Sequence, residues 1–141
     1  MTAILQKIAA FFTAILVLLG ILHPGTGQLN EKEGYAIDGA TVTFHFLSNP
    51  TTGYDWTMSQ EGDALTLTEE HYTQDPAPPG WGGVGGVKYY TFTADHAGSV
   101  TLRFVYGRSW EIIPARIITA RLTVDATGTL TVTSLTEINP N

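Results

Sequence analysis

The 141-residue chain contains no cysteine, and this absence removes several kinds of chemistry at once. Disulfides, thiolate zinc sites, haem attachment and cysteine nucleophiles all require a thiol. Charged residues are also scarce, at 14% of the chain, and seven Lys and Arg against thirteen Asp and Glu give a net charge of -6. No run of basic residues occurs, so the electrostatic footprint of a nucleic-acid-binding protein is missing. We therefore expect no nucleic-acid partner.

The one long apolar run lies at the N-terminus, where it follows the basic residue Lys7 and precedes small, turn-forming residues. This order is typical of a secretory signal peptide. The run, about fifteen residues ending at Leu22, is shorter than the roughly twenty residues of a spanning helix, although an uncleaved anchor is the alternative. We predict a signal peptide over residues 1–27, cut near Gly27, and no stable membrane anchor afterwards. The domain over residues 28–141 is then secreted or periplasmic, with a lysosome-like compartment as a further option.

From Gly34 onward, apolar and polar residues alternate with a period of two, and turn residues recur about every ten positions. The alternation places one residue in two on an inner face: Val42, Phe44, Phe46, Tyr54, Trp56, Met58, Leu65, Leu67, Tyr90, Phe92, Val100, Leu102, Phe104, Tyr106, Ile118, Ala120, Leu122, Val124, Leu130 and Val132. The pattern predicts an all-β protein. An immunoglobulin-like antiparallel β-sandwich of seven or eight strands fits this length, and a small barrel is the competing architecture.

Three segments interrupt the alternation, namely residues 49–53, 75–86 and 107–114. Departures from local rules are where binding sites are usually found. Two of the segments contain a tryptophan, Trp81 and Trp110, and a large aromatic in a loop beside an arginine has the composition of a binding hot spot. The alternative is that each tryptophan folds back over an end of the sandwich.

Three other sequence features do not indicate a nucleotide site, a metal site or a catalytic site. Residues 80–85 match the spacing G-x-G-x-x-G, but a dinucleotide site needs a strand before the motif and a helix after it, whereas here prolines precede and a strand follows. His45, His71 and His96 lack the spacing of metal ligands, so we expect no metal site. Without a nucleophile elbow, no Ser-His-Asp set can be singled out, and we assign no catalytic residue, cofactor or enzymatic activity.

The interrupting segments carry a resemblance to a known family. The chain resembles the chagasin family of cysteine-peptidase inhibitors in three motifs of matching order and spacing: Asn49-Pro50-Thr51-Thr52-Gly53-Tyr54 followed by Trp56, Gly83-Val84-Gly85-Gly86, and Tyr106-Gly107-Arg108-Ser109-Trp110. The similarity extends from Gly34 to Val124. The first motif is specific, and the glycine motif alone is weak. One departure occurs, because the third loop of the family reads Arg-Pro-Trp and this chain has Ser109 in place of the proline.

The resemblance implies a reversible, non-covalent inhibitor of papain-like cysteine peptidases, whose three loops form a wedge that blocks the active-site cleft. In that scheme Thr51 and Thr52 approach the catalytic cysteine of the enzyme, the glycine loop lies along one flank, and Arg108 and Trp110 hold the other flank. The implied peptidase-binding residues are Asn49, Pro50, Thr51, Thr52, Gly53, Tyr54, Gly83, Val84, Gly85, Gly86, Arg108, Ser109 and Trp110.

Within this set, Tyr54 is expected to act with Trp56 as a buried support beneath the first loop rather than as a contact. Replacing the proline by Ser109 leaves the third loop less preorganised, which lowers affinity without changing the mode of binding. We expect a monomer. The rival hypothesis is a secreted recognition module, for carbohydrate or adhesion, that uses Trp81 and Trp110 as stacking platforms.

Overall fold

The computed structural model describes residues 25–140, where nine strands and one short 3-10 helix form the regular structure. The strands are β1 (Thr26–Gln28), β2 (Gly34–Asp38), β3 (Thr41–Ser48), β4 (Tyr54–Glu61), β5 (Leu65–Gln74), β6 (Gly86–Ala94), β7 (Gly98–Arg108), β8 (Arg116–Val124) and β9 (Leu130–Ile138), and the helix η1 covers Pro50–Thr52. Within the described range, no helix has the length and hydropathy needed to cross a membrane. Most of the predicted signal peptide lies outside the described residues.

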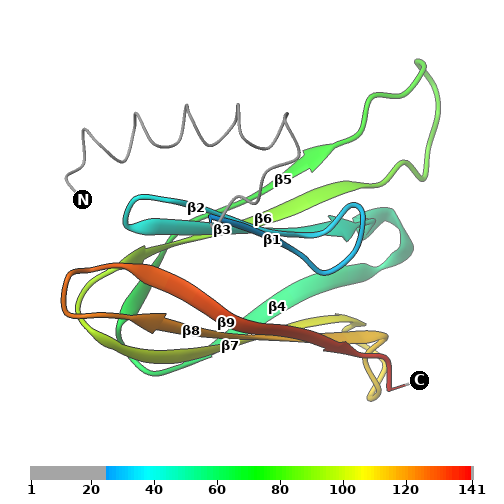
Figure 1. Cartoon of the computed structure of the whole chain (residues 1–141). Helices are drawn as coiled ribbons and strands as arrows, with labels where there is room; N and C mark the ends of the chain where they lie inside the picture. Colours follow the sequence, from blue (N-terminus) through cyan, green and yellow to red (C-terminus); the bar gives the residue numbers. More distant parts are fainter. Residues whose placement is uncertain (1–24, 141) are drawn as a thin grey trace.

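The strands form two antiparallel sheets that face each other (Figure 1). One sheet has the strand order β1-β2-β3-β6-β5 and the other has the order β4-β7-β8-β9. The predicted all-β sandwich is confirmed, and the competing barrel is not formed. The described part of the chain contains nine strands rather than seven or eight. The extra strand is the three-residue β1, of which Thr26 and Gly27 fall in the segment assigned to the signal peptide and Gln28 begins the predicted domain, so no alternation indicates it.

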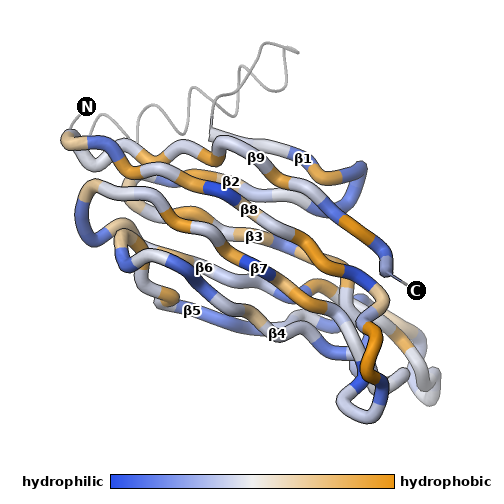
Figure 2. Tube along the Cα trace, turned by 90° about the horizontal axis from the view of Figure 1, so that it is seen from below, coloured by the Kyte–Doolittle hydropathy of each residue, from blue (hydrophilic) through white to orange (hydrophobic). Residues whose placement is uncertain are grey.

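The core lies between the sheets and is rich in aromatic side chains. The ring of Phe104 lies at its centre, with centroid distances of 5.1 Å to Phe44 and to Tyr90 and 4.9 Å to Phe46. Apolar and polar residues alternate along β7 and β8 in Figure 2, and the buried positions of these two strands are all apolar. Most residues predicted to point inward are buried, while Tyr54, Met58, Leu67, Tyr106 and Val132 are partly buried.

The two ends of the sandwich differ in chemistry. The β3–β4, β5–β6 and β7–β8 connections all lie at one end, which we call the loop end (Figure 1). All large hydrophobic residues that are exposed in the described range lie at or next to this end: Leu47, Trp81, Trp110, Ile112, Ile113 and Ile138. The turns at the opposite end instead present exposed carboxylates: Asp38, Glu61, Asp63, Asp95 and Asp125. Because water-exposed apolar groups gathered in one region are typical of an interaction surface, the loop end is the candidate binding site.

Candidate functional site

Loop 1, residues 49–53, is a single turn closed by its own hydrogen bonds. The backbone N–H of Thr52 donates to Asn49 O and that of Gly53 to Pro50 O, both at 3.1 Å. The two threonine hydroxyls also donate to Asn49, Thr51 Oγ1 to Oδ1 and Thr52 Oγ1 to the carbonyl oxygen, each at 2.6 Å. Pro50 opens η1, a position that suits its fixed φ. The result is a preorganised turn whose two exposed threonines form its tip.

Gly53 ends the turn in a conformation that glycine alone adopts without cost. Its φ is +83°, in the left-handed region. A Cβ atom at this position would also overlap the ring of Trp110, which lies directly against the Gly53 backbone. Gly53 therefore serves both the turn and the contact between loop 1 and the β7–β8 loop.

Loop 2, residues 75–85, extends beyond the other connections at the loop end (Figure 1). Asn49 Nδ2 donates to Gly83 O at 3.0 Å, so this loop is tied to loop 1. Trp81 is 70% exposed and Val84 is half-buried. At Gly85, an added Cβ would lie 3.1 Å from the carbonyl oxygen of Ser48, so the loop passes close to the end of β3.

Gly86 shows a related constraint, because a Cβ there would overlap the backbone of β5. Glycine at positions 85 and 86 thus serves close backbone approach inside the protein. Both glycines belong to the glycine motif that the resemblance assigns to contact with the enzyme. Gly83, with φ +71° and open space around it, is the glycine that remains free for such a contact.

Loop 3, residues 109–115, begins with a tight turn at the end of β7. The N–H of Glu111 donates to Arg108 O at 3.0 Å, which places Ser109 and Trp110 at the two central positions of the turn. Trp110 is 68% exposed. The alternative that this tryptophan folds over the sandwich end is realised only in part, since one region of the ring covers Gly53 and most of the side chain faces outward.

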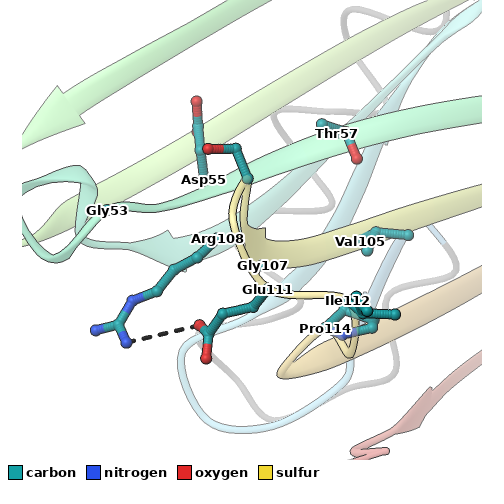
Figure 3. A pocket seen from close by; sticks show the side chains of 10 residues that line it. Gly53, Asp55, Thr57, Val105, Gly107, Arg108, Glu111, Ile112 and Pro114 are labelled. Carbon is teal, nitrogen blue, oxygen red and sulfur yellow. Dashed lines mark ion pairs between the residues drawn. The ribbon is translucent and has the colours of Figure 1, made fainter.

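Arg108 joins loop 1 to loop 3. Its Nε donates to Thr52 O at 3.0 Å, and its guanidinium lies 4.2 Å from the ring centroid of Tyr54 and 5.7 Å from that of Trp110. Its Nη1 forms an ion pair with Glu111 Oε1 at 3.6 Å, and Figure 3 marks this pair with a dashed line. In the free protein this side chain is therefore engaged within the site, where it orders two loops, rather than extended towards a partner.

The supports beneath loop 1 are aromatic. Trp56 is 3% exposed, as expected of a buried support, and Tyr54 is half-buried and stacked on Tyr106 with centroids 5.1 Å apart. The hydroxyl of Tyr106 accepts a hydrogen bond from the Asn49 N–H at 3.0 Å. The alternation places Tyr106 in the core and does not predict this contact. The signal was present in the sequence, because a tyrosine at an inward position needs a partner for its hydroxyl.

A pocket of about 480 Å³ lies beside loop 3 on the outer face of β4 and β7 (Figure 3). Gly53, Asp55 and Gly107 line it together with Glu111, Ile112 and Pro114. Ile112 is 99% exposed, and its neighbour Ile113 is also exposed. Neither isoleucine is among the residues predicted for the site, although an isoleucine pair in a turn-rich segment is a visible departure from the alternation.

The site holds no feature of a metal centre. Within residues 25–140, no group of three or more His, Asp or Glu side chains is arranged to hold a metal ion. His45 lies on β3, His71 on β5 and His96 in the β6–β7 turn, so the three histidines are spread over the sandwich.

A family model, a relative and two solved structures are similar to this chain. The model of the chagasin family peptidase inhibitor I42 matches residues 36–124. Amoebiasin-2 of Entamoeba histolytica is 28% identical over an alignment of 89 residues, and the match covers 59% of this chain and 71% of that protein. The crystal structure of the cysteine protease inhibitor EhICP2 from Entamoeba histolytica has a TM-score of 0.53 at 24% identity, covers 60% of this chain and 78% of its own, and supports the fold.

Amebosin, known from a solution structure, is 34% identical in sequence to this chain. The match covers 62% of this chain and 81% of the Amebosin chain, with a TM-score of 0.45. The matched residues 36–124 contain all three loops and their aromatic supports. This chain belongs to the chagasin family of peptidase inhibitors.

Proposed function

We propose that the protein inhibits papain-like cysteine peptidases reversibly, by inserting its loop end into the active-site cleft of the enzyme. The observation that carries the proposal is the joining of the three loops into one surface. Asn49 Nδ2 bonds to Gly83 O and Arg108 Nε bonds to Thr52 O, each at 3.0 Å, so that loop 1 is held between its two neighbours. Family membership supplies the enzyme class.

The order within this surface favours tight binding. Every hydrogen bond that holds the loops in the free protein removes part of the entropy cost of ordering them in a complex. The exposed Trp81 in loop 2 and Trp110 in loop 3 supply the large apolar contacts that usually dominate an interface. The surface is therefore built for rigid docking.

The chemistry at the tip of loop 1 favours a non-covalent mechanism. Thr51 and Thr52 present hydroxyls that already donate to Asn49, and the chain contains no thiol. Residues 50–52 form a closed 3-10 turn. A peptidase cleaves substrates held in an extended conformation, so this turn can occupy the cleft without being readily cut.

The test is a titration of papain with the purified protein, with a serine peptidase and a metallopeptidase as controls. We expect loss of papain activity alone, full recovery of activity after the partners are separated, and no mass adduct on either protein. A covalent adduct would contradict the mechanism. Binding to glycans without inhibition of papain would instead support the recognition-module hypothesis.

We also propose that the protein acts as a monomer. The long edge strand β5 carries Glu69 and Glu70, and charged residues on an edge strand oppose pairing with a second sheet. The apolar loop end is then free for the enzyme. Sedimentation velocity of the free protein should show a single species of one chain, and a dimer that disappears on adding papain would show that the loop end also self-associates.

The proposed compartment remains outside the cytoplasm, on the strength of the signal-peptide pattern in residues 1–27. Gly27 itself pairs with Tyr35 within β1 and β2. A cut at Gly27 would therefore divide β1, and only part of this edge strand would remain in the exported protein. Intact-mass measurement of the exported product locates the cut, and finding the uncut chain in the membrane fraction would favour the anchor.

A further inference from the structure

The end of β3 runs past its neighbour on one side before it enters loop 1. Strand β2 begins at Gly34, which pairs with His45, whereas β3 continues beside β6 as far as Ser48. The backbone of Leu47 therefore has no strand next to it on the β2 side. Because backbone N–H and C=O groups without a strand partner need other hydrogen-bonding groups, we expect side chains of other elements to bond to Leu47 on this side.

Side chains take the place of the missing strand. Glu33 Oε2 accepts a hydrogen bond from the Leu47 N–H at 2.8 Å, and Trp56 Nε1 donates to the Leu47 carbonyl at 3.0 Å. Two residues further, the Asn49 N–H donates to the Tyr106 hydroxyl at 3.0 Å. The backbone is thus held on this side up to the first residue of loop 1.

Glu33 is itself held by several donors. It is 2% exposed and is one of two buried polar residues in the described range. Arg116 grips the carboxylate with two bonds, Nη1 to Oε2 at 2.8 Å and Nη2 to Oε1 at 2.7 Å, and Asn30 Nδ2 donates to Oε1 at 2.6 Å. A bidentate arginine fixes the plane of a carboxylate as well as its charge. The oxygen offered to Leu47 therefore has one orientation.

Arg116 is the first residue of β8 and Glu33 directly precedes β2, so this pair links the two sheets. The guanidinium also bonds to Glu137 at the end of β9 and lies 5.3 Å from the ring centroid of Trp56. It thereby contacts both side chains that hold Leu47. A buried ion pair contributes little net stability compared with apolar residues, because desolvation offsets the attraction. The ion pair of Glu33 and Arg116 lies beneath loop 1, which favours a role other than stabilising the fold.

We infer that Glu33, oriented by Arg116, is a positioning residue for peptidase binding. By fixing Leu47, the carboxylate sets where β3 ends and where the turn bearing Thr51 and Thr52 is presented. This inference rests on the proposed function, since loop 1 is the part of the surface that enters the cleft.

Glu137 provides a matched control. Both Glu33 and Glu137 pair with Arg116, but of the two Glu33 alone bonds to Leu47. The variants Glu33→Met and Glu137→Met each leave Arg116 with one carboxylate and keep a side chain of similar length. Three quantities are measured on each full-length variant: the inhibition constant against papain, the free energy of unfolding, and the hydrogen-exchange rate of the Leu47 amide.

We expect Glu33→Met to raise the inhibition constant about tenfold, the factor that corresponds to 1.4 kcal/mol, and Glu137→Met to raise it less than about twofold. The Leu47 amide should exchange faster in Glu33→Met only. Equal inhibition constants in the two variants, or a lower stability of Glu33→Met with unchanged inhibition, would overturn the inference.

A second variant, Glu33→Gln, keeps an acceptor for the Leu47 N–H and should recover most of the inhibition and of the amide protection. It also serves if Glu33→Met does not fold, because an unprotected Leu47 amide in a folded Glu33→Gln protein would contradict the inference. Should the wild-type protein fail to inhibit papain, the proposed function falls, and the exchange rates still decide whether Glu33 orders loop 1.

Discussion

At the scale of single residues, Gly53 carries the strictest geometric demand of the site. Its left-handed φ strains any residue that carries a side chain, and a Cβ atom would overlap the ring of Trp110. We expect Gly53→Val to weaken papain inhibition at least about tenfold, because the backbone strain alone costs about 1–2 kcal/mol and the tryptophan must move as well. Thr51→Ser keeps the hydroxyl that bonds to Asn49 and should have a much smaller effect. Equal inhibition constants for the two variants would show that loop geometry is not the determinant.

A change at Trp110 should affect peptidase binding much more than the stability of the free protein. Its side chain is mostly exposed, so Trp110→Ala should leave the thermal midpoint of the free protein nearly unchanged. Truncation of a hot-spot tryptophan typically costs at least about 2 kcal/mol of binding energy, or roughly thirtyfold in affinity, and we expect a faster dissociation rate from papain. Surface plasmon resonance and thermal unfolding measure the two effects. Unchanged dissociation, or an unfolded variant, would remove the contact role of loop 3.

Several residue roles could be predicted from the sequence, and others could not. Trp56 as a support and Thr51 and Thr52 at a loop tip follow from alternation and from the family motif. The role of Arg108 does not, because its partner Thr52 is 56 residues away and only the folded chain shows which carbonyl its Nε meets. Glu33 was missed for a similar reason, as its partner Arg116 is 83 residues distant.

At the scale of elements, the turn that opens loop 3 tolerates proline. Ser109 occupies the first central position of the turn closed by Glu111 N and Arg108 O, where proline is favoured, and Arg108 lies in a strand, as a residue before proline prefers. Ser109→Pro should stabilise the protein by about 0.4–1 kcal/mol through lower entropy of the unfolded chain, and should slow dissociation modestly. Chemical denaturation and dissociation kinetics test this, and a destabilised variant would show that the turn has another backbone geometry.

The strands were predictable where one face is buried and the other is wet. In β3, Val42, Phe44 and Phe46 alternate with polar residues, and the period of two alone indicates a strand. Strand β1 offers no such signal, because its three residues, Thr26 to Gln28, are small or polar and are defined by pairing with β2. Elements fixed by a neighbour rather than by their own pattern are not readable from local sequence.

At the scale of the whole molecule, the link between the sheets makes stability depend on pH. Burial alone would raise the pKa of Glu33, but the hydrogen bonds from Arg116, Asn30 and the Leu47 amide outweigh it and hold the pKa below the ordinary 4.5. A carboxyl group with a lowered pKa in the folded state stabilises the protein above pH 4.5 and loses that contribution as the pH falls through its folded value. Stability should therefore decline on the acid side.

The comparison of wild type with Glu33→Gln isolates this contribution. The neighbouring His45 has a pKa lowered by burial and partly raised again by the charge of Glu33, so its own destabilisation begins nearer pH 6.5, above the window of Glu33. It is present in both proteins and is larger in the variant, which lacks the Glu33 charge. Between pH 7 and pH 3, the free energy of unfolding should fall more steeply below about pH 4.5 in the wild type than in the variant. Parallel curves in that window would mean that the Glu33 charge does not contribute.

The convergence of the three loops is a property of the whole fold that local sequence patterns do not show. Alternation predicts strands but not which connections share an end, and the contact of Asn49 with Gly83 depends on the pairing of β3 with β6. The gathering of exposed apolar side chains at the loop end and of carboxylates at the other end follows from the same topology.

The central claim is that the loop end enters the active-site cleft of the peptidase without forming a covalent bond to the enzyme. Its most direct test is the affinity of the protein for three forms of papain, measured by calorimetry: the free enzyme, the enzyme with a small alkyl cap on its catalytic cysteine, and the enzyme with its cleft filled by a bulky covalent ligand. We predict tight binding to the first, weaker but measurable binding to the second, and none to the third. Undiminished binding to the filled enzyme would contradict the account.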